Sequence, residues 1–434
     1  MSALASPVPV PQEVAVHEGP ALLAGLTDGP SLAAHRGRYG ALPEVGLAAL
    51  RELIRASGLR GRGGAAFPFV RKLDTAAGST ASRAPGRRGG REAVVVVNLS
   101  EGEPGSAKDS ALALTRPHLV LDGAVATACA LRAREVHVVV AGDRPAVRES
   151  VVRALDERDD AVPIRQHATE PRFVGGQARA VVELLAGRPN LPVTSWAPEA
   201  VAGLAGRPTL LSNAETWAHV GLLVLRGGAA YRHHGTDREP GTTLLTLTRP
   251  GFVPHVHEVG YGTRLRDLLP PGVHGHPALV GGFHGSWATW PTLRAARVSV
   301  PGMSALGAPL GAGVLLAPGG SCPLTLTSRV VDYLAGQSAG RCGPCHNGLP
   351  ALASVVRELV HGDADGGVSG AAGRAGRLAA LVTGRGACAH PDGTARLVRS
   401  VLAVFPDEVA EHAAGRCAVE PVGSAAEDAG EVAS

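Results

Sequence analysis

A short run of β-branched residues constrains the fold of this chain more than any other stretch. The segment EAVVVVNLS, residues 92–100, is continuously apolar through four valines, as expected of a strand buried on both faces of a sheet. A helical pattern follows over residues 117–132, and VHVVVAG, residues 136–142, is a second strand of this kind. Residues 143–156 predict another helix, with Asp143 as its N-cap. Strands alternating with helices predict an α/β fold with a parallel sheet.

The composition excludes several classes of protein. No stretch approaches about 20 apolar residues without Gly or Pro, which excludes a transmembrane helix. The N-terminus lacks the basic and apolar regions of a secretory signal. Six cysteines in 434 residues do not make a disulfide scaffold, so a cytoplasmic, reducing setting is expected. A net charge of +4 with scattered arginines and few aromatics gives no indication of nucleic-acid binding.

The richest motif is GLRGRGGAAFPFVRK, residues 58–72. Its glycines leave the backbone free to curl with N–H groups pointing inward, which forms a nest for anions. Arg62 and Lys72 add positive charge, and Lys72 is one of two lysines among the 42 basic residues. The motif is neither the dinucleotide fingerprint nor a P-loop. It predicts a site for a phosphate or pyrophosphate group, with a flexible Gly/Arg turn as the alternative.

A second motif, NLSEGEPGSAKD, follows directly after the first predicted strand. Ligands of open α/β sheets bind beyond the carboxyl ends of strands. Asn98, Glu101 and Glu103 are therefore placed to hydrogen-bond a ring system or ribose hydroxyls, with a charged surface loop as the alternative. Two weaker motifs, FVGGQARA at 173–180 and RPTLLSNAETW at 207–217, indicate by themselves a tight turn and a helix cap.

The segment QSAGRCGPCHNG, residues 337–348, holds Cys342 and Cys345 in a polar, Gly-rich turn. By itself it is consistent with a metal-cluster loop or with a redox C-x2-C pair.

The order and spacing of these motifs resemble the NADH-binding flavoprotein subunit of respiratory complex I. The same module occurs in NAD-linked hydrogenases and formate dehydrogenases. The resemblance implies a Rossmann-like FMN domain with a parallel sheet, a ubiquitin-like β-grasp (SLBB-like) module and a helical iron–sulfur domain. The expected boundaries are a loosely ordered leader at 1–40, the FMN/NADH-binding domain at 41–235, the β-grasp module at 240–296, the iron–sulfur domain at 322–417 and a disordered tail at 418–434.

The resemblance also implies the site residues. By matching position, the FMN phosphate would be held by the Gly-rich loop and its lysine, the flavin by the second motif, and the nicotinamide cofactor by Glu103 and a stacking Phe67. A late cysteine, Cys388, would join Cys342 and Cys345 as a ligand of a [4Fe-4S] cluster. The expected cofactor-binding residues are Gly61, Arg62, Gly63, Gly64, Phe67, Lys72, Asn98, Glu101, Glu103, Gly176, Ser212 and Asn213.

Several positions depart from the family pattern. Ser100 stands where the family has Asp, and Gln177 and Ala178 stand where it has two glutamates. In the cysteine loop the first ligand position is Ala339, which cannot bind iron. A [4Fe-4S] cluster with Ser338, His346, His390 or solvent on its fourth iron is favoured. A [3Fe-4S] cluster, a zinc site and a loop without metal are the alternatives.

The remaining cysteines carry no motif. Cys129 lies in an apolar helical pattern and is expected to be a core residue, and Cys322 and Cys417 are expected to be inert.

The implied function is electron transfer from NADH through FMN to the cluster and on to a ferredoxin-like or membrane reductase subunit. The expected location is cytoplasmic, peripheral to a membrane complex, and no side chain is assigned acid–base catalysis. One alternative is a relay that keeps both cofactors but no longer uses NADH. Another is a non-redox assembly subunit on the same scaffold.

Overall fold

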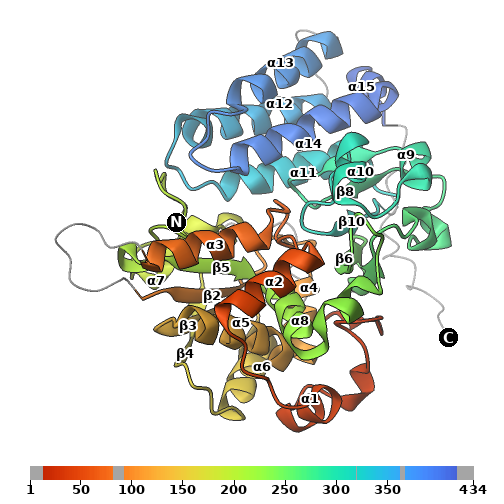
Figure 1. Cartoon of the computed structure of the whole chain (residues 1–434). Coiled ribbons are helices and arrows are strands. Elements are labelled where there is room, and N and C mark those ends of the chain that lie inside the picture. Colours follow the sequence, from red (N-terminus) through yellow and green to blue (C-terminus); the bar gives the residue numbers. More distant parts are fainter. Residues whose placement is uncertain (1–12, 82–91, 319, 362–366, 418–434) are drawn as a thin grey trace, which may run out of the picture.

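The computed structural model describes residues 13–81, 92–318, 320–361 and 367–417. Along the chain, a parallel sheet covered by helices is followed by a mixed sheet and then by a bundle of helices (Figure 1). The α/β class and the helical C-terminal region predicted from the sequence are therefore confirmed. Within the described residues, no helix is both long enough and apolar enough to cross a membrane.

The first sheet has four parallel strands in the order β4-β3-β2-β5. The valine run lies in β2, and its side chains are buried on both faces of the sheet, since alternate valines enter two separate cores. The strands are β2 (Val94–Leu99), β3 (Glu135–Ala141), β4 (Ile164–Thr169) and β5 (Thr209–Asn213). The helices of this domain are α2 (Leu47–Ser57), α3 (Phe69–Ala81), α4 (Lys108–Thr115), α5 (Pro117–Leu131), α6 (Pro145–Asp156), α7 (Ala178–Leu185) and α8 (Ala214–Arg232).

The two strands and two helices predicted around the valine run are confirmed as β2, α5, β3 and α6. The predicted cap of the last helix is wrong. Arg144, not Asp143, occupies the N-cap position of α6, and no side chain caps it. Arg144 turns inward instead, where it pairs with a buried glutamate described below.

The chain changes direction across the sheet at β2. From β2 it passes through β3 to β4 on one side, and it returns with β5 on the other side of β2. Asn98 at the end of β2 is paired in register with Asn213 at the end of β5. In open α/β sheets, ligands bind beyond the carboxyl ends of the strands at such a switch point. The topology therefore points to the edge formed by these two residues.

The second sheet is mixed and has six strands in the order β1-β7-β6-β10-β8-β9. Strands β6 and β10 are parallel, whereas β6–β7, β10–β8 and β8–β9 are antiparallel. The strands are β1 (Ala15–Val16), β6 (Thr242–Thr248), β7 (His255–Gly260), β8 (Ala278–Val280), β9 (Ser286–Ala288) and β10 (Val314–Leu316), and two short helices, α9 (Trp290–Ala295) and α10 (Val300–Ala305), lie between β9 and β10.

The expectation of a loosely ordered leader is wrong for residues 13–40. Strand β1 joins the edge of the second sheet, and α1 (Leu32–Tyr39) packs on the first domain. Leu22 and Leu23 are fully buried, because the buried carboxylate of Glu258 accepts hydrogen bonds from both of their N–H groups. Residues 1–12 and the predicted disordered tail, residues 418–434, lie outside the described residues.

The C-terminal bundle shares its core with the second sheet. Trp287 on β9 donates to Thr327 (2.9 Å), and its backbone N–H donates to Ser400 (2.9 Å). Phe283 and Trp287 pack in the same hydrophobic cluster as the bundle helices. These helices are α11 (Pro323–Gly336), α12 (Leu349–His361), α13 (Gly367–Val382), α14 (His390–Val404) and α15 (Pro406–Ala413).

Asp122 on α5 anchors α1 to the first domain. Its fully buried carboxylate lies 2.8 Å from His35 Nε2, 2.7 Å from Arg36 Nη1 and 2.8 Å from Arg158 Nη1. Burial acts to raise the pKa of Asp122, but the hydrogen bonds from His35 and Arg36 and the charge of Arg158 lower it to about 2. The carboxylate is thus ionised and is paired with two guanidinium groups.

Replacing Asp122 by Asn is expected to lower the free energy of unfolding by about 3 kcal/mol, because the buried Arg158 would keep only Asp160 as a counter-charge and Arg36 would lose its ion pair. Urea unfolding measures this change. Asp156→Asn, at an exposed position of α6, is the matched control and is expected to stay within about 0.5 kcal/mol of the unmodified protein. Equal effects of the two substitutions would contradict the assignment of Asp122 as an anchor.

Candidate cofactor site

The Gly-rich loop reaches the switch point of the first sheet. It is closed at its base, where the N–H of Gly61 donates to the carbonyl of Phe67 (2.8 Å). Gly64 has φ +98°, a conformation that favours glycine. A Cβ added to Gly63 would lie 3.9 Å from the side chain of Asn213. The loop therefore lies beside the first turn of α8, where backbone N–H groups favour an anion.

Lys72 lies on α3, shortly after this loop. Its Nζ donates to the carbonyl of Leu211 on β5 (3.3 Å). Burial lowers the pKa of Lys72, and the charge of Glu199 opposes this shift. Among the residues that the structure describes, no carboxylate lies within ion-pair distance of its ammonium group. A partly buried cation without a paired anion, next to a glycine nest, fits the phosphate of FMN.

The guanidinium of Arg62 lies in the core behind the loop. It donates to Tyr231 Oη (3.1 Å) and to the carbonyl of Thr242 (3.0 Å), and its Nε is 3.8 Å from Glu215. Its backbone N–H donates to Thr216 on α8 (2.9 Å). The side chain of Arg62 thus fixes the loop, and the structure does not bring it together with Lys72 as a second phosphate-binding charge.

Lys108, the other lysine, forms a fully buried ion pair with Glu215. Its Nζ is 2.7 Å from Glu215 Oε2 and also donates to the carbonyl of Arg62 (2.7 Å). The other oxygen of Glu215 accepts from Thr243 Oγ1 and from the N–H of Leu244, both at 2.9 Å. One ion pair therefore joins the loop, α4, α8 and β6.

Asn98 holds the Gly-rich turn that precedes α7. Its Nδ2 donates to the carbonyl of Gly176 (2.7 Å), and its Oδ1 accepts from the N–H and hydroxyl of Ser100 (3.1 and 2.5 Å). Ser212 and Asn213 lie on the neighbouring strand, opposite Val97 and Asn98. The structure thus brings Asn98, Gly176, Ser212 and Asn213 to one edge, together with the tip of the Gly-rich loop.

The carboxylate of Glu101 caps α4. It accepts from the N–H groups of Asp109 and Ser110 (both 2.9 Å) and is 2.7 Å from Arg144 Nη1. Burial acts to raise the pKa of Glu101, but Arg144 and the hydrogen bonds from Ser110 and Asp109 lower it overall. With φ +37°, Glu101 is one of few non-glycine residues in the left-handed region. The side chain of Glu101 is thus used to cap α4. Only its backbone is available to contact a ligand at the carboxyl ends of β2 and β5.

Glu103 connects the first domain to the second sheet. Its carboxylate accepts from the N–H of Phe283 (2.9 Å) and of Gly105 (3.3 Å). A Cβ on Gly282, which has φ +81°, would lie 2.5 Å from it. Burial raises the pKa of Glu103 to about 7, against the two backbone hydrogen bonds.

Two aromatic side chains, one in the Gly-rich loop and one after α7, are exposed. Phe67, in the Gly-rich loop, is 44% exposed, and Trp196, in the segment after α7, is fully exposed. Exposed aromatics beside a nucleotide site can stack on a base or on nicotinamide.

The three predicted cluster cysteines converge between α11 and α14. Cys342 Sγ is 3.5 Å from Cys345 Sγ in the turn before α12. Cys388 precedes α14, and the adjoining Ala387 N–H donates to Cys342. Burial and the nearby Cys342 thiol both raise the pKa of Cys388. Three converging, partly buried thiols fit a cluster that takes three protein thiolates.

The side chains around Ala339 separate the candidates for a fourth ligand. His390 is fully buried, with one ring nitrogen 3.0 Å from His284 and the other 2.8 Å from the carbonyl of Leu334. Both of its nitrogens are therefore in use. His346 is exposed, and its ring lies 3.9 Å from the position of a Cβ on Gly340, directly after Ala339. This favours His346 or solvent over His390.

The turn before α7 contacts the segments that carry the cluster cysteines. The side chain of Gln177 hydrogen-bonds the thiol of Cys388. The N–H of Phe173, at the start of the same turn, donates to Gln337 (2.9 Å), just before the cysteine loop. The turn held by Asn98 at the flavin edge thus contacts the cysteine loop directly.

Sequence reasoning missed the residues that support the site from behind. Arg144, Glu215 and Ser110 lie outside the predicted set, although all three are buried and bond to Glu101 or Lys108 of the second motif. The one sequence feature that could have pointed to them is Lys108, because lysine is rare in this arginine-rich chain and a retained lysine suggests a specific partner. Cys129, predicted to be a core residue, is exposed on α5.

Comparison with known proteins gives two family matches. A model described as the Nuo51 FMN-binding domain matches residues 54–222, and one described as the NADH-ubiquinone oxidoreductase-F iron-sulfur binding region matches residues 325–412. The order of an FMN-binding domain and an iron–sulfur region, expected from the motifs, is confirmed.

Individual relatives match over most of their length. The F subunit of NADH-quinone oxidoreductase from Mycobacterium tuberculosis (strain H37Rv) is 30% identical over 401 residues, which cover 85% of this chain and 86% of that protein. The F 2 subunit of the enzyme of the same name from Rhizobium meliloti is 29% identical over 386 residues, covering 83% and 88%. The crystal structure of an NAD+-reducing [NiFe]-hydrogenase in the H2-reduced state shares the fold, with a TM-score of 0.77, 22% identity and coverage of 92% of this chain and 68% of that chain. The chain belongs to the family of NADH-quinone oxidoreductase F subunits, a family of oxidoreductases.

The raised pKa of Glu103 predicts a pH-dependent stability. A carboxyl group whose folded-state pKa lies at about 7, above the ordinary 4.5, contributes stability below about pH 4.5 that is lost as the pH rises to about 7. Glu103→Gln is therefore expected to raise the free energy of unfolding by up to about 3 kcal/mol at about pH 8. The melting temperature of the variant should exceed that of the unmodified protein at this pH, and the difference should be smaller at about pH 5. Thermal unfolding across this range measures it.

Glu149→Gln, at an exposed position of α6, is the control and is expected to leave the pH profile unchanged. A parallel pH profile for Glu103→Gln and the unmodified protein would show that Glu103 does not titrate in this range.

Proposed function

We propose that the chain is an electron-transfer subunit that passes electrons from NADH through FMN to an iron–sulfur cluster and on to a partner subunit. The observation that carries this proposal is the contact between the two halves of the site. Asn98 donates to the carbonyl of Gly176 (2.7 Å), and the N–H of Phe173, in the same turn, donates to Gln337 at the start of the cysteine loop (2.9 Å). Membership of a family with both an FMN-binding and an iron–sulfur model supports it.

When bound, FMN and the cluster supply the chemistry that links two-electron and one-electron transfer. The residues of this chain position them. Lys72, the glycine N–H groups and the first turn of α8 would bind the FMN phosphate, and Asn98 and Asn213 would lie on the side of the flavin. Phe67 and Trp196 are placed to stack on the nicotinamide cofactor. Cys342, Cys345 and Cys388 would hold three irons of the cluster, with Ser338, His346 or solvent at the fourth.

The finer features of the fold and setting belong to the same proposal. The order β7-β6-β10-β8-β9, with β6 and β10 parallel at the centre, supports a ubiquitin-like β-grasp module. The module then extends past the expected residues 240–296 to β10. The described residues hold three cysteines of one cluster site, so a ferredoxin-like or membrane reductase subunit is the proposed acceptor, in a cytoplasmic, membrane-peripheral assembly.

A specific observation favours a second function, a relay that takes electrons from a donor other than NADH. Arg179 forms an ion pair with Glu199 (2.8 Å) and donates to the carbonyl of Ala197. These contacts fasten α7 to the segment that carries Trp196, next to positions 177 and 178 where the family's two glutamates are absent. Because the segment that carries Trp196 is held to α7, and positions 177 and 178 lack carboxylates, this region is less suited to bind a dinucleotide.

Anaerobic NADH titration of the FMN-reconstituted protein separates these functions. For an NADH-oxidising subunit, flavin absorbance is expected to bleach at micromolar to millimolar NADH, the usual range of KM values. Electron paramagnetic resonance of the same samples reports reduction of the cluster. Bleaching by dithionite but not by millimolar NADH would overturn the NADH assignment and favour the relay. Protein that binds neither flavin nor iron when purified anaerobically would favour the assembly subunit.

Lys72→Met is expected to weaken FMN binding at least about ten-fold, because the phosphate loses a charge-assisted partner. Riboflavin, which lacks the phosphate, is expected to bind the variant and the unmodified protein equally. Fluorescence titration of both flavins measures the difference, and Arg71→Met, at an exposed position of the same helix, is the control. Equal weakening for FMN and riboflavin would place Lys72 outside the phosphate site.

A further inference from the structure

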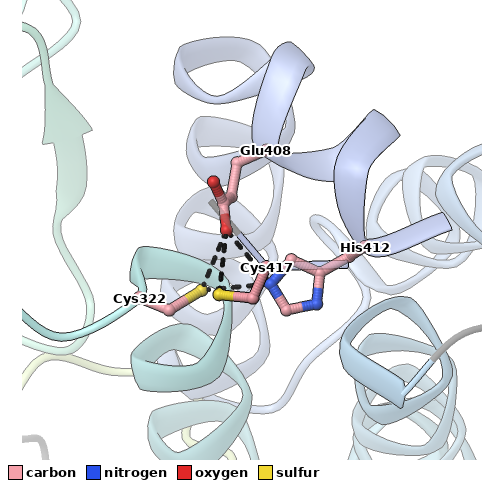
Figure 2. Close-up of side chains that lie close together, drawn as sticks. All are labelled: Cys322, Glu408, His412 and Cys417. Carbon is pink, nitrogen blue, oxygen red and sulfur yellow. Dashed lines mark hydrogen bonds and ion pairs between the residues drawn. The ribbon is translucent and has the colours of Figure 1, made fainter. Parts of the chain in front are cut away.

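Four metal-ligating side chains gather near the N-terminal end of α11. They are Cys322, Glu408, His412 and Cys417, and their ligand atoms all lie within 4.8 Å of one another (Figure 2). Cys322 and His412 are buried, Glu408 is half-buried and Cys417 is exposed. The cysteine loop follows the other end of α11, a 14-residue helix about 21 Å long. The cluster cysteines and these four residues therefore form two separate groups.

The distances among these atoms are close to those of a tetrahedral metal site. Cys322 Sγ is 3.2 Å from His412 Nε2 and 3.4 Å from Glu408 Oε1. Cys417 Sγ is 3.4 Å from the same carboxylate oxygen, which is 3.1 Å from His412 Nε2. Around a zinc ion, thiolate, imidazole and carboxylate ligands lie about 3.4–3.8 Å from one another, given metal–ligand bonds of about 2.0–2.3 Å. Small outward shifts of these side chains would accommodate the ion.

The orientation of His412 is fixed in the way that metal ligation requires. Its Nδ1 lies 2.7 Å from the carbonyl of Val360 at the end of α12. A carbonyl accepts, so Nδ1 carries a proton, and Nε2 is the ring nitrogen that faces Cys322 Sγ and Glu408 Oε1. Such a hydrogen bond on the far nitrogen is typical of metal-bound histidine.

The backbone brings the other ligands to His412. Glu408 and His412 lie one turn apart on α15, and thus on one face of the helix. After α15, Gly415 has φ +72°, and Arg416 is held to Glu411 by a backbone and a side-chain hydrogen bond (2.9 and 2.8 Å). This turn returns Cys417 to the site. Cys322 occupies the N-cap position of α11, so its sulfur lies at the end of the bundle that α15 reaches.

We propose that Cys322, Glu408, His412 and Cys417 form a structural zinc site that fastens α15 to the start of α11. Two thiolates with an imidazole and a carboxylate match the preferences of Zn²⁺, which accepts both soft and borderline ligands in tetrahedral geometry. Four protein ligands leave no open position for a substrate, so the site is structural. The proposal does not rest on electron transfer, and it corrects the expectation that Cys322 and Cys417 are inert.

The test is elemental analysis of the full-length protein purified anaerobically. About one zinc per chain is expected, in addition to the iron of the cluster. Cys322→Ser and His412→Ala are each expected to lower zinc affinity at least about ten-fold while iron content stays unchanged. Cys345→Ser is expected to do the reverse, losing iron and keeping zinc. Cys129→Ser, at an exposed cysteine of α5, is the matched control and is expected to retain both metals.

Cobalt(II) titration of the reduced, zinc-depleted protein tests the ligand set without a substitution. Tetrahedral d–d bands and a thiolate-to-cobalt charge-transfer band are expected, and zinc is expected to abolish both. The proposal is overturned if the unmodified protein neither retains zinc nor gives these bands, or if Cys322→Ser retains zinc with unchanged affinity. Mass spectrometry that finds a Cys322–Cys417 disulfide in the anaerobic protein would also overturn it.

Discussion

The buried ion pair between Lys108 and Glu215 is the interaction on which the cofactor site depends. Removing two charges from water is costly, and the cost is offset only when every remaining donor and acceptor is satisfied. Here the partners come from the Gly-rich loop, α4, α8 and β6. Because an unpaired member would be left charged in the core, these four elements have one low-energy arrangement. That arrangement sets the loop tip beside Asn213 at the switch point of the sheet.

The two glutamates of the second motif hold the neighbouring elements in place in the same way. Glu101, paired with Arg144, fixes the start of α4, and Glu103, bonded to Phe283, fixes the second sheet against the first domain. Both carboxylates lie just beyond β2, so the residues between strand and helix are held from both sides. This edge of the sheet is therefore held in place by contacts within the chain, and such preorganisation reduces the entropy cost of binding a ligand.

The sequence was informative where local chemistry decides the structure. The valine run could be only a two-sided strand, and the glycines of residues 58–64 predicted a backbone nest, since both depend on neighbours in the chain. Arg62 and Glu101 were predicted to be site residues. The contacts of their side chains were not predicted, because they involve Tyr231 and Arg144, which are far away in the sequence. Glu258 and the Cys322 group escaped prediction for the same reason. Their partners come together only through tertiary packing, so the spacing of these residues along the chain does not predict the contacts.

The departures from the family pattern act in one direction. By the resemblance to the complex I flavoprotein subunit, Ser100, Gln177 and Ala178 stand where acidic residues are expected, and Ala339 stands where a cysteine is expected. Gln177 in addition hydrogen-bonds the sulfur of Cys388. Loss of negative charge around a redox centre, and hydrogen bonds to its sulfur ligands, both stabilise the reduced state. Both centres are therefore expected to be easier to reduce than with the family residues, which suits a chain that receives electrons from a weaker donor than NADH or passes them to a stronger acceptor.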